Sequence, residues 1–77
     1  MRSLKNVSIK EYKAFLDKQK CSHYRTKGGH EHWAKPGLAR PITFQTHIDP
    51  IPKHIIENGL RTLVVSKKDF IKFLESL

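Results

Sequence analysis

Two adjacent glycines, Gly28 and Gly29, constrain the fold of this chain more than any other feature of its sequence. They separate two short stretches that fit the two-residue period of β-strands. A Gly-Gly loop is typical of a tight β-hairpin, because the favoured turns need positive φ angles. We therefore predict one strand over residues 22–27 and its return strand over residues 30–35.

A third strand is expected after a second turn. Pro36 and Gly37 are typical turn residues, and Ile42 and Phe44 then alternate with polar residues over positions 41–47. Three strands joined by short turns predict a small antiparallel sheet.

A helix is expected before the sheet. Ser8 and Glu11 have the spacing of a capping box, in which a hydroxyl and a carboxylate bond the first free backbone N–H groups. Apolar residues then recur at helical spacing. We predict a helix over residues 8–20.

Two helices are expected after the sheet. Apolar residues have helical spacing over positions 51–60, where Asn58-Gly59 marks either the end of this helix or a weak point. Ser66 is a cap-like start for a last helix over residues 67–76. The order α-β-β-β-α-α predicts an α+β fold, a three-stranded antiparallel sheet with helices on one face.

Side-chain alternation sorts the strands into two faces. The side chains expected to face the helices are Tyr24, Trp33, Ile42 and Phe44. The polar side chains expected on the open side are His23, Arg25, Lys27, His30, His32, Thr43, Gln45 and His47. Glu31 and Lys35 share the side of Trp33, which conflicts with an apolar inner face unless they lie near strand ends. A register shift of one residue would reverse any strand.

The chain is strongly basic. Fifteen Lys and Arg against seven Asp and Glu give a formal charge of +8 on 77 residues. Such a field attracts polyanions, which indicates nucleic acid or an acidic protein as partner. The length predicts one domain over residues 1–77 with a small core, so a site should lie on an open face or in a shallow groove.

The single cysteine, Cys21, cannot form a disulfide within the chain, which favours a reducing compartment. The first residues lack the apolar core of a signal peptide, and no apolar stretch reaches membrane-spanning length. We therefore expect a cytoplasmic protein with no membrane among its partners. Because the core of so short a chain is too small for a large enclosed cavity, we also expect no small-molecule cofactor.

If the chain cleaves RNA, a base must take a proton from the attacking oxygen. His30 is the candidate catalytic residue for this role, because the ordinary pKa of histidine, about 6.5, suits proton transfer near neutral pH. Lys27 and Arg25 would hold phosphate oxygens, and Arg can do so with two parallel hydrogen bonds. One imidazole cannot be base and acid at once, and His47, His32 or Lys27 could be the partner. The further candidates for RNA contact are Gly28, Gly29, His32, Thr43, Gln45 and His47.

Two other interpretations of these histidines remain open. His30 could be an ordinary solvated side chain on a common type of hairpin. Alternatively, the His30-x-His32 pair with a third ligand has the residue types of a metal site. The possible third ligands are His23, His47 and Cys21. The surrounding positive charge disfavours a divalent cation, and we expect no metal.

The hairpin resembles that of the HicA toxins of bacterial and archaeal toxin–antitoxin pairs. The residues that carry the resemblance are Arg25-x-Lys27-Gly28-Gly29-His30, Ile42-Thr43-Phe44-Gln45-Thr46-His47 and Leu60-Arg61-x-Leu63. The resemblance covers residues 8–76. This chain has Gly29 where members have a hydroxyl residue, Gln45 where many have proline, and an extra capped helix from Ser66.

The resemblance implies a fold similar to that of double-stranded-RNA-binding domains and the activity of a metal-independent mRNA endonuclease. The catalytic role of the hairpin histidine falls on His30. The implied partners are mRNA as substrate and a HicB-like antitoxin that covers the open face. An alternative is a non-catalytic RNA-binding module of the same fold. A third possibility is that the basic face serves only an acidic protein partner.

Overall fold

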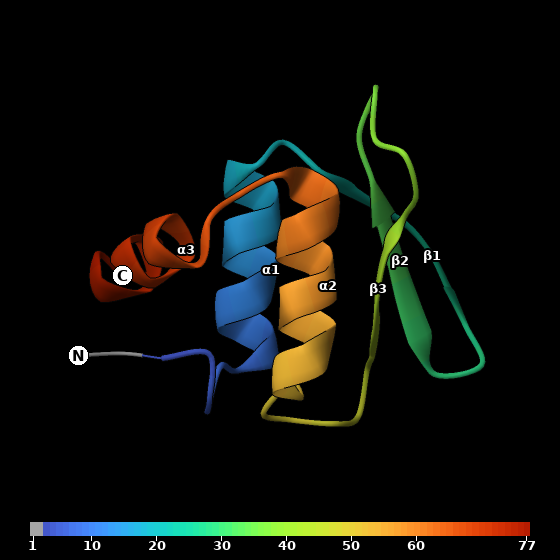
Figure 1. Cartoon of the computed structure of the whole chain (residues 1–77). Coiled ribbons are helices and arrows are strands. Elements are labelled where there is room, and N and C mark those ends of the chain that lie inside the picture. Colours follow the sequence, from blue (N-terminus) through green and yellow to red (C-terminus); the bar gives the residue numbers. More distant parts are fainter. Residues whose placement is uncertain (1–2) are drawn as a thin grey trace.

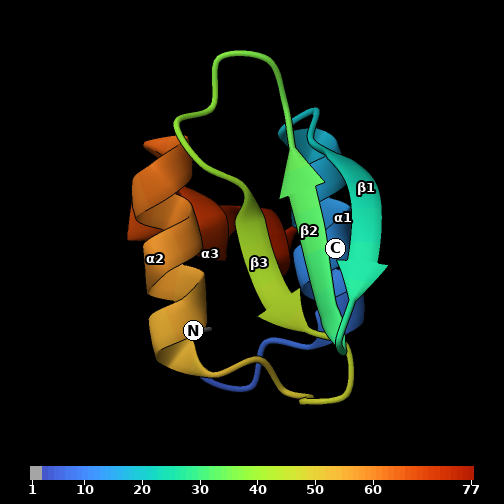
Figure 2. The same cartoon turned by 90° about the vertical axis from the view of Figure 1, so that its right-hand side faces the viewer.

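The computed structural model describes residues 3–77 and confirms the predicted α+β fold. Its elements are α1 (Ile9–Lys18), β1 (Ser22–Lys27), β2 (His30–Ala34), β3 (Ile42–Gln45), α2 (Lys53–Leu63) and α3 (Lys67–Glu75). The strands form one antiparallel sheet in the order β1-β2-β3. The helices lie on one side of this sheet (Figure 1), and its other face is open (Figure 2). Over the described residues, no helix combines the length and the apolar character needed to cross a membrane.

Both ends of α1 are fixed by local hydrogen bonds. The Ser8 hydroxyl accepts from the Glu11 backbone N–H, and the Glu11 carboxylate accepts from the Ser8 backbone N–H, both at 3.0 Å. At the other end, the Cys21 N–H donates to the Leu16 carbonyl at 2.9 Å around Lys20, whose φ is 65°. This is the Schellman arrangement, in which glycine usually takes the position of Lys20.

The hairpin between β1 and β2 has the predicted two-residue loop. Gly28 and Gly29 have φ angles of 60° and 76°. Positive φ at both loop residues matches the right-handed twist of the strands, and glycine adopts it without a steric penalty. Lys27 and His30 are therefore paired directly across the base of the loop.

A β-bulge in β1 reverses two of the predicted side-chain directions. His23 pairs with Trp33, and their rings lie 5.7 Å apart. Arg25 pairs with His32, which leaves Tyr24 as the extra residue. Tyr24 is 53% exposed, and its ring lies 6.1 Å from that of His32. The predictions of an inward Tyr24 and an outward His23 are wrong, because the bulge shifts the alternation by one residue.

The core lies between the sheet and the helices and contains a cluster of aromatic rings. Tyr12 of α1 meets Phe44 of β3 with ring centroids 5.4 Å apart, and Phe15 of α1 meets Phe70 of α3 at 4.7 Å. Both pairs are edge-to-face, a favourable arrangement of aromatic quadrupoles. All four rings are fully buried. Although α3 lies on the far side of α1 from the sheet (Figure 1), it completes this core.

Glu31 is buried on the inner side of β2 despite its charge. Its carboxylate accepts a hydrogen bond from the Trp33 indole N–H at 3.1 Å and forms an ion pair with Lys13 of α1 at 3.1 Å. Burial of a carboxylate is tolerated when both oxygens are paired in this way. Lys35 lies just beyond the end of β2 and donates to the Gln19 carbonyl at 3.2 Å. These partners resolve the conflict in the predicted inner face.

The second helix runs through Asn58-Gly59 to Leu63, so these two residues do not mark its end. Gly59 is buried against α1, and a Cβ atom there would overlap the Tyr12 hydroxyl. The glycine is therefore explained by close packing of two helices rather than by helix termination.

Candidate nucleic-acid interface

The open side of the sheet carries two rows of side chains, each with one residue from every strand. The first row is Lys27, His30 and Gln45, and the second row is Arg25, His32 and Thr43. Residues paired across an antiparallel sheet project to the same side. We call these six residues the open face. The structure therefore brings together six of the nine residues predicted to act on or contact RNA.

The His30 imidazole is oriented by its own hairpin. Its Nδ1 lies 3.1 Å from the carbonyl oxygen of Gly28. A carbonyl can only accept, so Nδ1 carries the proton and donates. In the neutral ring, Nε2 then has a free lone pair and can accept a proton from a substrate. The geometry thus prepares His30 for general-base chemistry.

His32 is held by a different contact. Its Nδ1 lies 3.0 Å from the Thr43 hydroxyl in the same row, and the exposed Tyr24 ring lies beside it. Tyr24 adds a flat aromatic surface to this end of the open face. Sequence reasoning missed Tyr24, because only the bulge turns this side chain outward.

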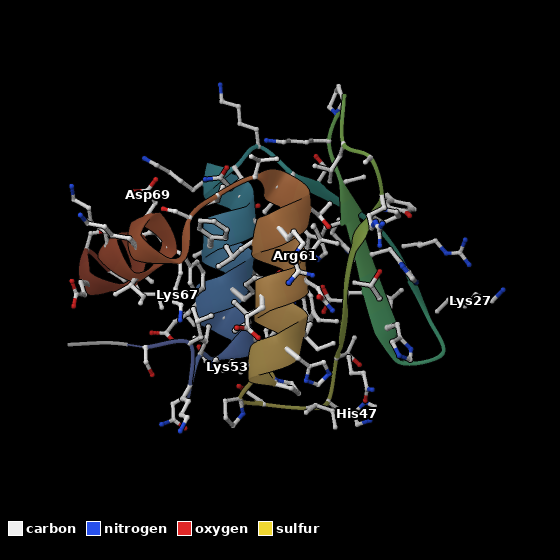
Figure 3. The ribbon with its side chains drawn as sticks, in the orientation of Figure 1. Lys27, His47, Lys53, Arg61, Lys67 and Asp69 are labelled. Carbon is white, nitrogen blue, oxygen red and sulfur yellow. The ribbon has the colours of Figure 1, made fainter. Side chains whose placement is uncertain are left out.

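His47 lies beyond the end of β3 and packs against the hairpin loop. A Cβ atom on Gly29 would stand 3.3 Å from Cε1 of His47. The adjacent Thr46 N–H donates to the Gly29 carbonyl at 2.8 Å, which fixes this approach. Gly29 and His47 thus contact each other, and the imidazole occupies the space into which a side chain at position 29 would project. Figure 3 shows His47 near the lower end of β3.

The open face is electrostatically one-sided. Arg25 and Lys27 are exposed, and Lys27 points away from the helices (Figure 3). Glu31 is the only acidic residue in the three strands, and it faces the helices, paired with Lys13. A phosphate approaching the open face therefore meets cations, imidazoles and neutral hydrogen-bonding groups, with no strand carboxylate to repel it.

A cavity of about 310 Å³ adjoins the open face where β3 leads to the start of α2. Its lining consists of His30, Thr43, Phe44, Gln45, Ile48, Ile51, Pro52, His54 and Ile55. Sequence reasoning did not select Ile48 or His54. The available signal was weak: an apolar residue in a polar turn and a histidine in the first turn of a helix.

A larger groove of about 600 Å³ lies between β3 and the C-terminal half of α2. Arg40 and Arg61 line it, and His30 does not. Arg61 belongs to the third element of the HicA resemblance, in which Leu60 and Leu63 are buried in the core. Of these two cavities, only the smaller one contains the oriented imidazole of His30.

The alternative metal site lacks a suitable geometry. Among residues 3–77, no three His, Cys, Asp or Glu side chains come together in a group that could hold a metal ion. His23 lies on the opposite side of the sheet from His32. Cys21 is buried, and this burial raises the pKa of its thiol, although the nearby Lys35 charge opposes the shift.

Comparison with known proteins gives no match, since no family model, curated protein or solved structure is significantly similar to this chain. The geometry of the open face and the residues of the hairpin are therefore the features that bear on function.

Proposed function

We propose that this chain is a HicA-like endoribonuclease that cleaves mRNA without a metal ion, with His30 as its general base or acid. The observation that carries the proposal is the hydrogen bond from His30 Nδ1 to the Gly28 carbonyl, because it leaves Nε2 available on a cationic surface. The resemblance of the hairpin and third strand to HicA toxins supports the same assignment.

In the proposed reaction, Nε2 of His30 takes the proton of a ribose 2′-hydroxyl. The resulting oxygen attacks the adjacent phosphorus, the bond from phosphorus to the 5′ oxygen breaks, and that oxygen takes up a proton. The products are a 2′,3′-cyclic phosphate and a free 5′-hydroxyl. Lys27 shares a row with His30 and would stabilise the charge that develops on the phosphate oxygens, with Arg25 in the next row.

The leaving oxygen needs a proton donor, because one imidazole cannot serve both roles at once. Two other imidazoles lie near the His30 end of the open face. His54 lines the same cavity as His30, and His47 packs against Gly29, the residue that precedes His30. Both are candidates for this second role.

The proposed biological role is that of a toxin neutralised by a HicB-like antitoxin. An antitoxin that covers the open face would exclude RNA and would need acidic groups to match Arg25 and Lys27. The reading frame next to the gene provides a direct check, because a HicB-like sequence there supports the toxin–antitoxin assignment.

The decisive test replaces His30 with alanine and measures cleavage of mRNA in a chelator-containing buffer. We expect the rate to fall by about 10²–10⁴-fold, the usual contribution of a general base. His23→Ala is the matched control, because His23 is also an exposed strand histidine but lies on the opposite side of the sheet. Circular dichroism of both variants should match the wild type.

Undiminished cleavage by His30→Ala would exclude the catalytic assignment. The non-catalytic RNA-binding module is the second candidate, and the Tyr24 ring beside the cationic rows favours it independently of any catalytic group. It predicts that the wild-type protein binds RNA and leaves it intact for hours. If RNA fails to compete with an acidic protein partner for the open face, that partner is the ligand instead.

A further inference from the structure

The cavity beside His30 is lined mainly by apolar side chains, which binding of a phosphate to the open face does not explain. We propose that it holds one unstacked nucleobase of single-stranded RNA, next to the bond that is cleaved. This inference rests on the proposed binding of RNA to the open face, and it adds a base-binding subsite to that face.

The walls of the cavity are mainly apolar. Ile48, Ile51 and Ile55 contribute aliphatic surface, with Pro52 and Phe44 beside them. Apolar walls of this kind offer no charged group to a phosphate, whose charge would lose part of its hydration there. A base has two apolar faces, and the volume of about 310 Å³ accommodates one base. The walls therefore match a heterocyclic ring and not the RNA backbone.

A few polar groups interrupt this apolar lining. The Gln45 amide has both donor and acceptor atoms, which can pair with the edge of a base. The imidazoles of His30 and His54 offer flat rings on which a base can stack. Among the residues that the structure describes, no carboxylate lines the cavity. This combination of apolar walls and a few polar groups is typical of selective ligand pockets.

The position of His30 connects the cavity to the reacting atoms. His30 lines the cavity, and the same residue shares its sheet row with Lys27. A nucleotide with its base in the cavity would place its ribose at His30 and its phosphate toward Lys27. The cavity thus selects which 2′-hydroxyl reaches the imidazole, because base and ribose are joined by one bond.

This arrangement requires single-stranded RNA. Bases in an A-form duplex are stacked and paired, and extracting one costs several kcal/mol. Unpaired bases can leave the stack freely and are the usual targets of base recognition by RNA-binding proteins.

The test measures affinity with RNA that cannot be cleaved. The probes are 2′-O-methyl hexamers of adenylate and of uridylate, and an abasic hexamer with the same backbone. We expect the wild-type protein to bind at least one base-bearing hexamer about tenfold or more tightly than the abasic one. Ile48→Ala should reduce this ratio while leaving the abasic affinity unchanged, and Gln45→Ala should also reduce the ratio.

The matched control is Val64→Ala, which truncates an exposed aliphatic residue outside the cavity and should keep the wild-type ratio. Equal affinities of the wild-type protein for base-bearing and abasic hexamers would overturn the subsite. A ratio unaffected by both cavity variants would overturn it as well. Because the probes lack a free 2′-hydroxyl, a protein without nuclease activity gives the same readout, so failure of the catalytic proposal is detected separately in the cleavage assay.

Discussion

Tyr12 places a polar hydroxyl in the apolar core of the protein. Its hydroxyl is fully buried and, within residues 3–77, has no hydrogen-bond partner. Burial raises the pKa of this phenol above its ordinary value, and the nearby Cys21 thiol adds to the shift. A buried hydroxyl without a partner costs about 1–3 kcal/mol of desolvation. The Tyr12 ring packs in the aromatic core and stabilises the fold, whereas the unpaired hydroxyl on the same side chain destabilises it.

We expect Tyr12→Phe to raise the free energy of unfolding by about 1 kcal/mol, because it removes the unpaired hydroxyl and keeps the ring. It should also reduce the loss of stability at alkaline pH. In the wild type the unfolded phenol ionises near pH 10 while the folded phenol stays neutral, so stability is lost as pH rises above about 10. Denaturant titrations between pH 7 and 11 should show a smaller loss in the variant.

The Tyr12–Gly59 contact provides a coupled check at this scale. A Cβ atom on Gly59 would overlap the Tyr12 hydroxyl, so Gly59→Ala should be destabilising even though alanine is the better helix former. The same substitution in the Tyr12→Phe background should be less destabilising. Equal effects in the two backgrounds would show that the hydroxyl is not the atom that limits this approach.

Among the elements, α2 ends in an unfavourable backbone conformation. Val64 follows the last turn with φ 58° and ψ 45°, and the Val65 N–H donates to the Leu60 carbonyl at 3.0 Å. This is the same termination as at Lys20 after α1, and neither position is glycine. A β-branched residue is especially disfavoured in the left-handed region.

Val64→Gly should therefore stabilise the protein by about 0.5–1 kcal/mol, the left-handed penalty less the extra chain entropy of glycine. Val64 is 89% exposed, so little packing is lost. The control is Lys72→Gly, an exposed position inside α3, which should lower stability by about 0.5–1 kcal/mol. Thermal unfolding of both variants measures the contrast, and a destabilised Val64→Gly protein contradicts the explanation.

Sequence patterns predicted elements well where local chemistry decides them. The capping box of Ser8 and Glu11 and the Gly28-Gly29 loop were sufficient for α1 and the hairpin, because their hydrogen bonds and φ angles are local. The directions in β1 failed at Tyr24, since every residue of this edge strand is exposed and the alternation carries no burial signal there.

The candidate site was predictable only in part. The two rows follow from strand alternation once the hairpin is known, and His30 was selected from its place beside the loop. The cavity was not predictable, because Ile48 and His54 reach His30 through the turn that follows β3. The hydrogen bond that sets the proton position on His30 also depends on the folded loop.

At the scale of the whole molecule, positively charged side chains lie in two separate regions, one on the sheet and one at α3. Lys27 extends from the sheet, whereas Lys67 lies by α3 on the other side of the helices (Figure 3). Arg25 stands on the same face of the sheet as Lys27. If the open face binds RNA, only the cations of this face should release counterions from the phosphates.

We expect the affinity for single-stranded RNA to fall with salt, with a log–log slope of about −0.7 per phosphate contacted. Removing Arg25 and Lys27 together by substitution with alanine should make the slope shallower by about 1.4. The control is the double substitution of Lys67 and Lys72 by alanine. It removes the same amount of charge from α3 and should leave the slope near the wild-type value. Fluorescence anisotropy measures the RNA affinity of both double variants at salt concentrations from about 50 to 300 mM. Identical slopes for both double variants would place the RNA elsewhere.

Consecutive residues of β2 alternate between the core side and the open face of the sheet. Glu31 and Trp33 hold the sheet to α1, while His30 and His32 contribute nothing to the hydrophobic interior. Mutations on the outward positions can therefore accumulate without loss of a folded protein. Related chains could therefore differ at the outward positions of β2 and keep the same architecture.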